Sequence, residues 1–460
     1  MAGIDLLTGW PNVGGSLQMS IGGSVLVSVK ASTALLFTCR TGYEFIMSVY
    51  SFASGSKRFE SNPGLSPEEH LLIQASRIRL SLEEGLHFKH LLEDGPDWPN
   101  VVQGAKRFGV LPLLYKHLSE GGRSSLVPDP VMAELRIYRR FLAFRTFQLH
   151  RSALQLFEKI SDRNLRVMPL KGIYLGEALY GDITLRPVSD IDILCRKEDL
   201  DTMHCILESM GYRQPVIYKS KLHERLLQGK SSHCPPYCSK QLGQVEVHTH
   251  TLPGIGYDHE LMESVWRSSK PFSFGGAKLN GLSLEDQLFH LSLHLHHHAA
   301  GSGGIALYWF CDIHEWISKN VSHTDWERFC HRAVSVGVNK RIGELLVLMK
   351  TVWHTDIPPD ALEMLDASGH SLSMKQILHR EKSTYFLTSI KKIRRATLIP
   401  GWSNRCRYMA RYLFPQREYL LYRYKPKRAD NVWIYRILHP LRVVYRGVSS
   451  IAWWLLEKRS

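Results

Sequence analysis

The middle of the chain constrains the fold most, because there the apolar residues stop following helical spacing. LRVMPL (165–170), LRPVSDIDIL (185–194) and QVEVHTH (244–250) are short apolar or alternating runs, a pattern typical of β-strands. KEDLDTMHCILESMGY, which follows the second run, has amphipathic helical spacing and ends at Gly211. Strands that alternate with helices predict an α/β unit at the centre of the chain.

Helices are predicted on both sides of this unit. SPEEHLLIQASRIRLSLEE begins at Ser66 with a capping serine, a proline and two acids, which is the usual start of a helix, and helical spacing continues to residue 164. After a GIGY loop, four more helices are predicted from SLEDQLFHLSLHLHHH onward. We therefore predict an α+β fold with a helical subdomain at 66–164, an α/β core at 165–255, a C-terminal helical subdomain at 256–365 and a basic, aromatic region at 366–460.

The remaining features bear on the start of the chain and its compartment. Residues 1–65 have few charges, many Gly and Ser and no helical periodicity, which favours a poorly ordered extension. The apolar run at 21–39 carries Lys30 and several hydroxyl residues, so we expect no membrane span.

The eight scattered cysteines fit a reducing, cytoplasmic compartment. Cys234 and Cys238 lack a second pair of ligands at metal spacing, which favours reduced thiols over zinc.

Two aspartates inside an apolar run call for a chemical explanation. On a strand Asp190 and Asp192 share one face, and Ile191 and Ile193 share the other. Neighbouring carboxylates repel each other and lose hydration when buried, so a divalent cation is their natural partner. The same pair also fits a strand end that lies in solvent, and it needs support from other residues.

That support comes from the two neighbouring strands. Lys171 and Gly172 end the first strand, where glycine permits the close approach of a phosphate and the next helix supplies N–H groups. Glu246 shares a face of the third strand with His248, so a third carboxylate can reach the aspartates. This is the layout of a two-metal phosphoryl-transfer site.

These segments carry a family resemblance. LKGIYLGEALYGDITLRPVSDIDIL, followed by EVHTH, resembles the poorly characterised bacterial nucleotidyltransferase-like family of the DNA polymerase β superfamily, and the similarity extends from residue 66 to about residue 360. The resemblance implies a mixed β-sheet core of the nucleotidyltransferase type. It also implies transfer of a nucleoside monophosphate from a nucleoside triphosphate to an unknown acceptor, with Mg²⁺ or Mn²⁺ as cofactor and release of pyrophosphate.

The resemblance assigns roles residue by residue. It implies catalytic, metal-binding carboxylates at Asp190, Asp192 and Glu246. It implies contacts with the nucleotide from Lys171, Gly172 and Arg186.

Two of these positions need comment. Better-known members of the superfamily begin the site with Gly-Ser, so the role of Lys171 is inferred from its charge. Arg186 suits a phosphate clamp because guanidinium binds phosphate oxygens bidentately, although it could instead pair with Asp182 or Asp190. Thr249 also stands where an aromatic residue is common in the family.

A histidine stripe and a helical aspartate lie further along. His290, His294, His297 and His298 have helical spacing but alternate with leucines, which favours an active-site rim or a partly buried helix face over a metal site. Asp312 matches a family position and is expected to pair with an arginine, to cap a loop or to orient Lys171.

Positive charge is concentrated at the C-terminus. From residue 381 onward there are 18 Lys and Arg residues against four acidic ones, which is nearly all of the net charge of +15. Three interpretations remain open: a solvated tail, a surface for nucleic acid or another acidic partner, and an interfacial membrane helix.

Three other classes of protein compete with the transferase. The first is a catalytically inactive nucleotide-binding protein of the same fold, and the second is a non-catalytic RNA-binding module. The third is a sugar-nucleotide glycosyltransferase, whose DxD also binds a metal; it would need a nucleotide-binding α/β half before the aspartates, where residues 66–164 instead look helical.

Overall fold

The computed structural model describes residues 16–21, 25–30, 35–39, 44–47, 64–215, 232–252, 257–300, 304–367, 373–379, 401–426 and 431–457. The chain divides after Gly64 into two compact units. The first contains four short strands, each antiparallel to the next along the chain. They are β1 (Ser16–Ile21), β2 (Val25–Lys30), β3 (Leu35–Cys39) and β4 (Glu44–Met47). They lie within the segment for which the sequence favours a poorly ordered extension, and a sheet was not expected there.

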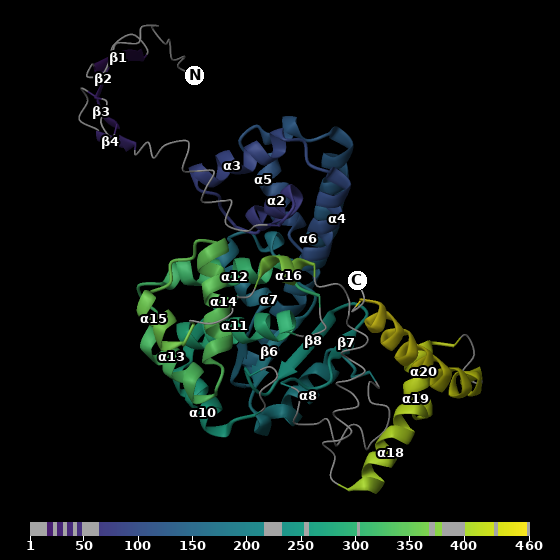
Figure 1. Ribbon diagram of the computed structural model, residues 1–460. Helices are drawn as coiled ribbons and strands as arrows, with labels where there is room; N and C mark the ends of the chain where they lie inside the picture. The colour runs from purple at the N-terminus through teal and green to yellow at the C-terminus, as the bar shows by residue number, and fades with distance from the viewer. Residues whose placement is uncertain are drawn as a thin grey trace. The chain divides into compact units, whose positions relative to one another are not determined.

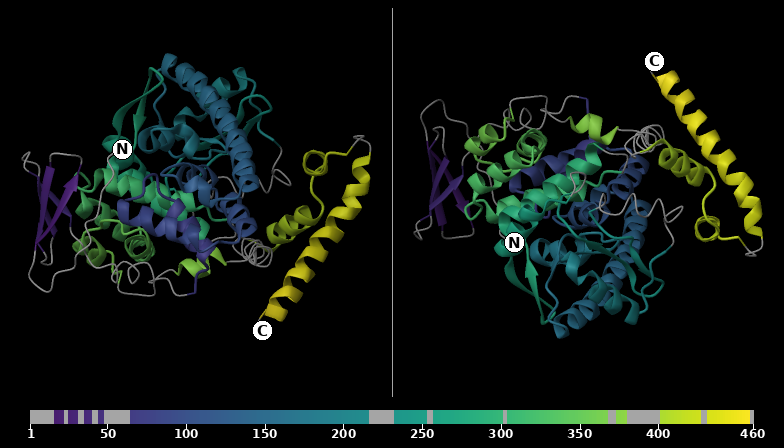
Figure 2. Two further views of the ribbon diagram at one scale, coloured as in Figure 1. Left: turned by 90° about the horizontal axis from the view of Figure 1, so that it is seen from above. Right: turned by 90° about the horizontal axis from the view of Figure 1, so that it is seen from below.

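The second unit begins with helices. Ser66 caps the first of them: its hydroxyl accepts a hydrogen bond from the Glu69 amide, and the Glu69 carboxylate accepts one from the Ser66 amide. The longest of these helices, α6, contacts both the preceding helix α5 and strand β8 of the sheet described below (Figures 1 and 2). These elements are α2 (Pro67–Ala75), α3 (Leu82–Glu93), α4 (Trp98–Phe108), α5 (Leu111–Ser119), the 3₁₀ turn η1 (Arg123–Leu126) and α6 (Asp129–Asp162).

A mixed four-stranded sheet follows, in the order β5-β6-β8-β7. β6 and β8 are parallel, and the other two pairings are antiparallel. The strands are β5 (Val167–Pro169), β6 (Ile191–Cys195), β7 (Tyr237–Ser239) and β8 (Gly243–His248). The connections contain α7 (Gly172–Leu175), the π-helical turn η2 (Gly176–Tyr180), the 3₁₀ turns η3 (Ile183–Leu185) and η4 (Lys197–Asp199), and α8 (Leu200–Ser209).

The two faces of the sheet differ in what they contact. Ile191, Ile193, Val245 and Val247 are buried in one core with apolar residues of α6 and α8. Because side chains alternate along a strand, Asp192, Glu246 and His248 lie on the opposite face. The predicted alternation therefore places the polar residues together and away from α6.

The C-terminal helices complete the core. They are α10 (His259–Ser268), α11 (Leu284–Ala300), α12 (Leu307–Asn320), α13 (Trp326–Ser335), α14 (Asn339–Val352), α15 (Pro359–Met364) and α16 (Met374–Leu378), and a hairpin of β9 (Lys270–Phe274) and β10 (Ala277–Gly281) separates α10 from α11.

The helices before and after the sheet share one hydrophobic core. Leu71 of α2 and Phe310 of α12 belong to the same buried cluster, and the Trp353 indole donates a hydrogen bond to the Ser76 hydroxyl at 3.1 Å. The α+β class is as predicted, but the two helical segments are packed together and are not separate flanking subdomains. The seven cysteines after β3, from Cys195 to Cys406, are free thiols.

The basic C-terminal region contains three described helices: α18 (Trp402–Leu413), α19 (Arg417–Tyr424) and α20 (Val432–Glu457). α19 and α20 contact each other, and the Tyr424 and Tyr435 rings stack with centroids 4.6 Å apart. Within the described residues, no helix is both long and apolar enough to cross a membrane.

Candidate functional site

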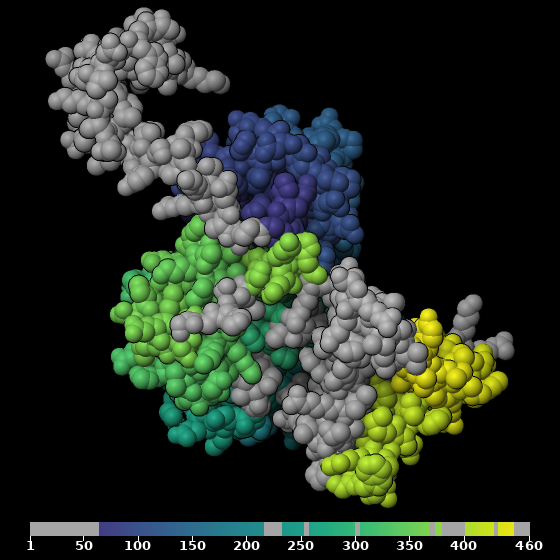
Figure 3. Space-filling view, in the orientation of Figure 1, coloured from purple at the N-terminus to yellow at the C-terminus, as the bar shows by residue number. Residues whose placement is uncertain are grey.

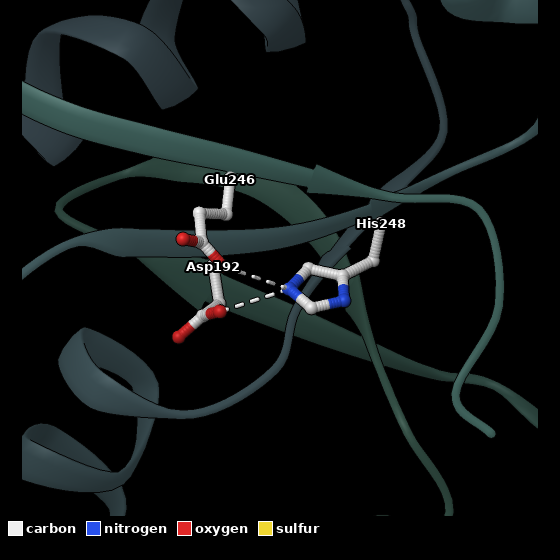
Figure 4. Close-up of side chains that lie close together, drawn as sticks. All are labelled: Asp192, Glu246 and His248. Atoms are coloured by element: carbon white, nitrogen blue, oxygen red, sulfur yellow. Dashed lines mark hydrogen bonds and ion pairs between the residues drawn. The ribbon is translucent and has the colours of Figure 1, made fainter. Parts of the chain in front are cut away.

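The parallel pairing of β6 with β8 creates the centre of the site. In its register Asp192 lies directly opposite Glu246, so their side chains leave the same face of the sheet. His248 follows on that face, and its Nε2 lies 2.9 Å from Asp192 Oδ1 and 3.9 Å from Glu246 Oε2 (Figure 4). One ligand atom from each of the three residues lies within 4.8 Å of the others.

Lys171 reaches this centre from the end of β5. Its Nζ lies 2.9 Å from Asp192 Oδ1, and both side chains are nearly buried. Burial would raise the pKa of Asp192, but the Lys171 ammonium and the hydrogen bond with His248 hold that pKa well below its usual range. Asp192 is therefore an anion at neutral pH.

Asp190 lies just before β6, beside the triad of Asp192, Glu246 and His248. Its Oδ1 accepts a hydrogen bond from the Ser189 hydroxyl at 3.0 Å. Burial, followed by the negative charges of Asp192 and Glu246, raises the pKa of Asp190 to about 7. The three predicted carboxylates thus influence one another, although His248 completes the closest group instead of Asp190.

This donor set fits a divalent cation. Carboxylate oxygens are the preferred ligands of Mg²⁺ and Mn²⁺. Burial and the negative charges of Asp192 and Glu246 together raise the pKa of Asp190, and the Lys171 ammonium offsets them only in part. A cation bound between Asp190, Asp192 and Glu246 would relieve that repulsion.

The raised pKa of Asp190 predicts a pH-dependent gain in the free energy of unfolding for Asp190→Asn. Because the folded-state pKa is raised from 3.8 to about 7, the folded protein is disfavoured once Asp190 ionises. Without metal, we expect the variant to be more stable than wild type by on the order of 1–2 kcal/mol above pH 7, and the gain to vanish as pH falls toward 4. Urea unfolding in chelator measures it; a gain that is equal at pH 4 and pH 8 would contradict the electrostatic cause.

Arg186 is engaged differently from the expected phosphate clamp. Its Nε and Nη2 donate to the two carboxylate oxygens of Asp312 at 2.9 and 2.7 Å, and both side chains are buried. The Tyr180 hydroxyl donates to the same carboxylate at 2.8 Å. The bidentate edge of Arg186 is therefore occupied by Asp312, not by Asp182 or Asp190, and Asp312 does not contact Lys171.

Gly172 lies close to the segment that leads into β6. A Cβ at this position would lie 3.1 Å from Val188 Cγ1, 3.3 Å from the Asp190 carbonyl oxygen and 3.8 Å from Arg186 Nη1. A side chain would therefore press on the segment that leads into β6.

The histidine stripe continues the site along α11. His290 is buried beside His248, with ring centroids 6.4 Å apart, and its Nδ1 hydrogen-bonds to the Thr251 carbonyl oxygen at 3.1 Å. His294 follows one turn later and contacts the Trp309 ring edge to face at 4.9 Å. Burial, together with the positive charge of Lys171, lowers the pKa of His290 to about 3, so this ring is neutral.

The stripe does not extend the candidate metal centre. Among the described residues, the only group of three or more ligand atoms within 4.8 Å is the one formed by Asp192, Glu246 and His248. The Nε2 of His290 is buried without a hydrogen-bond partner among the described residues, which leaves a lone pair available to a donor group of a ligand. His290 is buried and His297 is exposed, so the stripe forms a partly buried helix face, one of the two alternatives expected from the sequence; its place at the rim of an active site stays a prediction.

Comparison with known proteins adds the family. A family model described as uncharacterised nucleotidyltransferase matches residues 94–354, more than half of the chain. The chain belongs to this family, and the matched range includes every residue of the site from Lys171 to His294. No match was found among curated proteins or among solved structures.

Proposed function

We propose that this protein is a metal-dependent nucleotidyltransferase of the DNA polymerase β superfamily. The observation that supports it most is that Asp192 and Glu246 lie opposite each other on parallel strands. Lys171 Nζ lies 2.9 Å from Asp192 Oδ1, and Asp190 is beside them. Asp190, Asp192 and Glu246 would hold a divalent metal there, and that metal would stabilise the negative charge that develops during phosphoryl transfer.

Each residue of the site has a separate role in the proposed reaction. An acceptor hydroxyl oxygen attacks the α-phosphorus, the bond from that phosphorus to the bridging oxygen breaks, and pyrophosphate leaves. Glu246 is partly exposed and lies at the centre, so it can take the proton from the acceptor hydroxyl. Lys171 would pair with the triphosphate, and the backbone at Gly172 would approach it.

The competing classes fit the structure less well. A glycosyltransferase would place a nucleotide-binding α/β half before the aspartates, whereas residues 67–162, all described, contain helices and turns. Glu246, a partly exposed third carboxylate opposite Asp192, can accept a proton from an acceptor, a function that an inactive nucleotide-binding protein does not need.

Replacing Lys171 with methionine tests the nucleotide-binding role. We expect Lys171→Met to weaken the Mg²⁺-dependent affinity for nucleoside triphosphate by roughly ten- to a hundredfold, because a nearly buried charge-assisted contact is lost. Isothermal titration calorimetry measures the affinity. Lys278→Met, at an exposed position of β10, is the matched control and should bind as wild type does. Equal affinity of Lys171→Met and wild type would remove Lys171 from the nucleotide site.

A further inference from the structure

α20 exposes a row of large apolar side chains. Trp433, Ile437, Leu441 and Val444 are 59%, 59%, 62% and 58% exposed. Spacings of four, four and three residues put them on one side of the helix. Leu438 and Tyr445, which are 47% and 73% exposed, widen this apolar row.

The opposite side of α20 is occupied by α19. Val432 and His439 are buried, and the Tyr424 hydroxyl and His439 Nδ1 are 2.7 Å apart. Tyr435 stacks on Tyr424. The apolar row is thus the side of α20 that faces away from α19; the three helices are yellow-green to yellow in the space-filling view (Figure 3).

Positive charge borders the apolar row. Arg436 and Arg442 are both exposed, and at about 100° per residue they lie on opposite margins of the row. Acidic residues are few in this part of the chain, where 18 Lys and Arg residues stand against four acids from residue 381 onward. A partner that covers the row would therefore be apolar within and anionic at its edge.

We propose that α20 lies on the surface of an anionic lipid bilayer, with the apolar row among the acyl chains and Arg436 and Arg442 at the headgroups. An amphipathic helix of this kind lies in the interface, and each Lys or Arg near the surface adds attraction to acidic lipid. A nucleic acid fits less well, because bases stack on aromatic faces, and between the aromatic Trp433 and Tyr445 at its two ends the row consists of aliphatic side chains. The proposal is independent of the nucleotide chemistry.

Co-sedimentation of the full chain with vesicles tests the proposal. We expect wild type to bind vesicles in which about a third of the lipid is phosphatidylglycerol and the rest phosphatidylcholine, and to bind pure phosphatidylcholine much less. Ile437→Glu/Leu441→Glu should bind the anionic vesicles at least about tenfold more weakly, since two buried apolar contacts are lost. Leu82→Glu, at an 80% exposed leucine of α3, is the matched control and should bind as wild type does.

Circular dichroism checks that each variant retains its helices, and Ile437→Ser/Leu441→Ser replaces the glutamate variant if that one unfolds. Failure of wild type to bind anionic vesicles would overturn the proposal. Equal binding by wild type and the folded double variant would also overturn it. A single-stranded oligonucleotide that binds wild type while the vesicles do not would assign the surface to nucleic acid instead.

Discussion

Asp192→Asn is expected to abolish binding of a divalent cation at the site and to lower nucleotidyl transfer by on the order of a thousandfold, because a bound metal contributes several kcal/mol of transition-state stabilisation. Among the described residues, Asp192 is the only one of the predicted carboxylates that contacts both Lys171 and His248. Its Oδ1 lies 2.9 Å from Lys171 Nζ and 2.9 Å from His248 Nε2. Asparagine retains an oxygen acceptor for these two groups and removes the negative charge. Electron paramagnetic resonance of Mn²⁺ measures the binding directly.

The control for this variant is Asp201→Asn, at an exposed position of α8. It removes one carboxylate from the same part of the chain and should leave Mn²⁺ binding unchanged. Because the pKa of Asp192 is held well below 3.8, its ionised form contributes stability at neutral pH that is lost as pH falls. Unfolding curves therefore accompany the measurement, and a folded Asp192→Asn protein that binds Mn²⁺ as wild type does would place the metal elsewhere.

The second large effect concerns stability. Asp312→Ala leaves the Arg186 guanidinium buried without its carboxylate, and we expect a loss of about 3–5 kcal/mol in the free energy of unfolding. Replacing both partners, as in Arg186→Met/Asp312→Leu, should recover most of that loss because no uncompensated charge remains. Urea unfolding followed by tryptophan fluorescence measures both variants.

An exposed ion pair provides the comparison. Lys89 and Glu93 lie one turn apart on α3, with a 3.3 Å contact and about half of each side chain exposed. Glu93→Gln should cost less than about 1 kcal/mol. If Asp312→Ala lowered the free energy of unfolding by as little, the ion pair with Asp312 would not hold Arg186 in place. Arg186 would then again be a candidate for binding phosphate.

Much of the fold follows from local signals in the sequence. The capping box of Ser66 and Glu69 starts α2 as predicted, and the alternation of Asp192 with Ile191 and Ile193 assigns the two faces of β6. Which strand lies beside β6 is not a local property. That Asp192 stands opposite Glu246 depends on a parallel pairing between segments more than 50 residues apart.

The residues that the sequence placed less well depend on still longer contacts. Asp312 lies 126 residues from Arg186, so its carboxylate could not be chosen over Asp182 or Asp190 from spacing alone. His248 was placed on the correct face, but its contact with Asp192 follows from the strand register. The shared core of the helices before and after the sheet also requires tertiary packing that hydrophobic periodicity does not encode.

The central claim is that Asp190, Asp192 and Glu246 bind a nucleoside triphosphate through a divalent metal. Calorimetric titration of wild type and Asp192→Asn with ATP, GTP, CTP and UTP, each with and without Mg²⁺, tests it most directly. The account predicts that at least one nucleotide binds wild type only when Mg²⁺ is present, and that the folded variant loses this binding. Wild type that binds none of the four with Mg²⁺, or a variant that binds as wild type does, would contradict it.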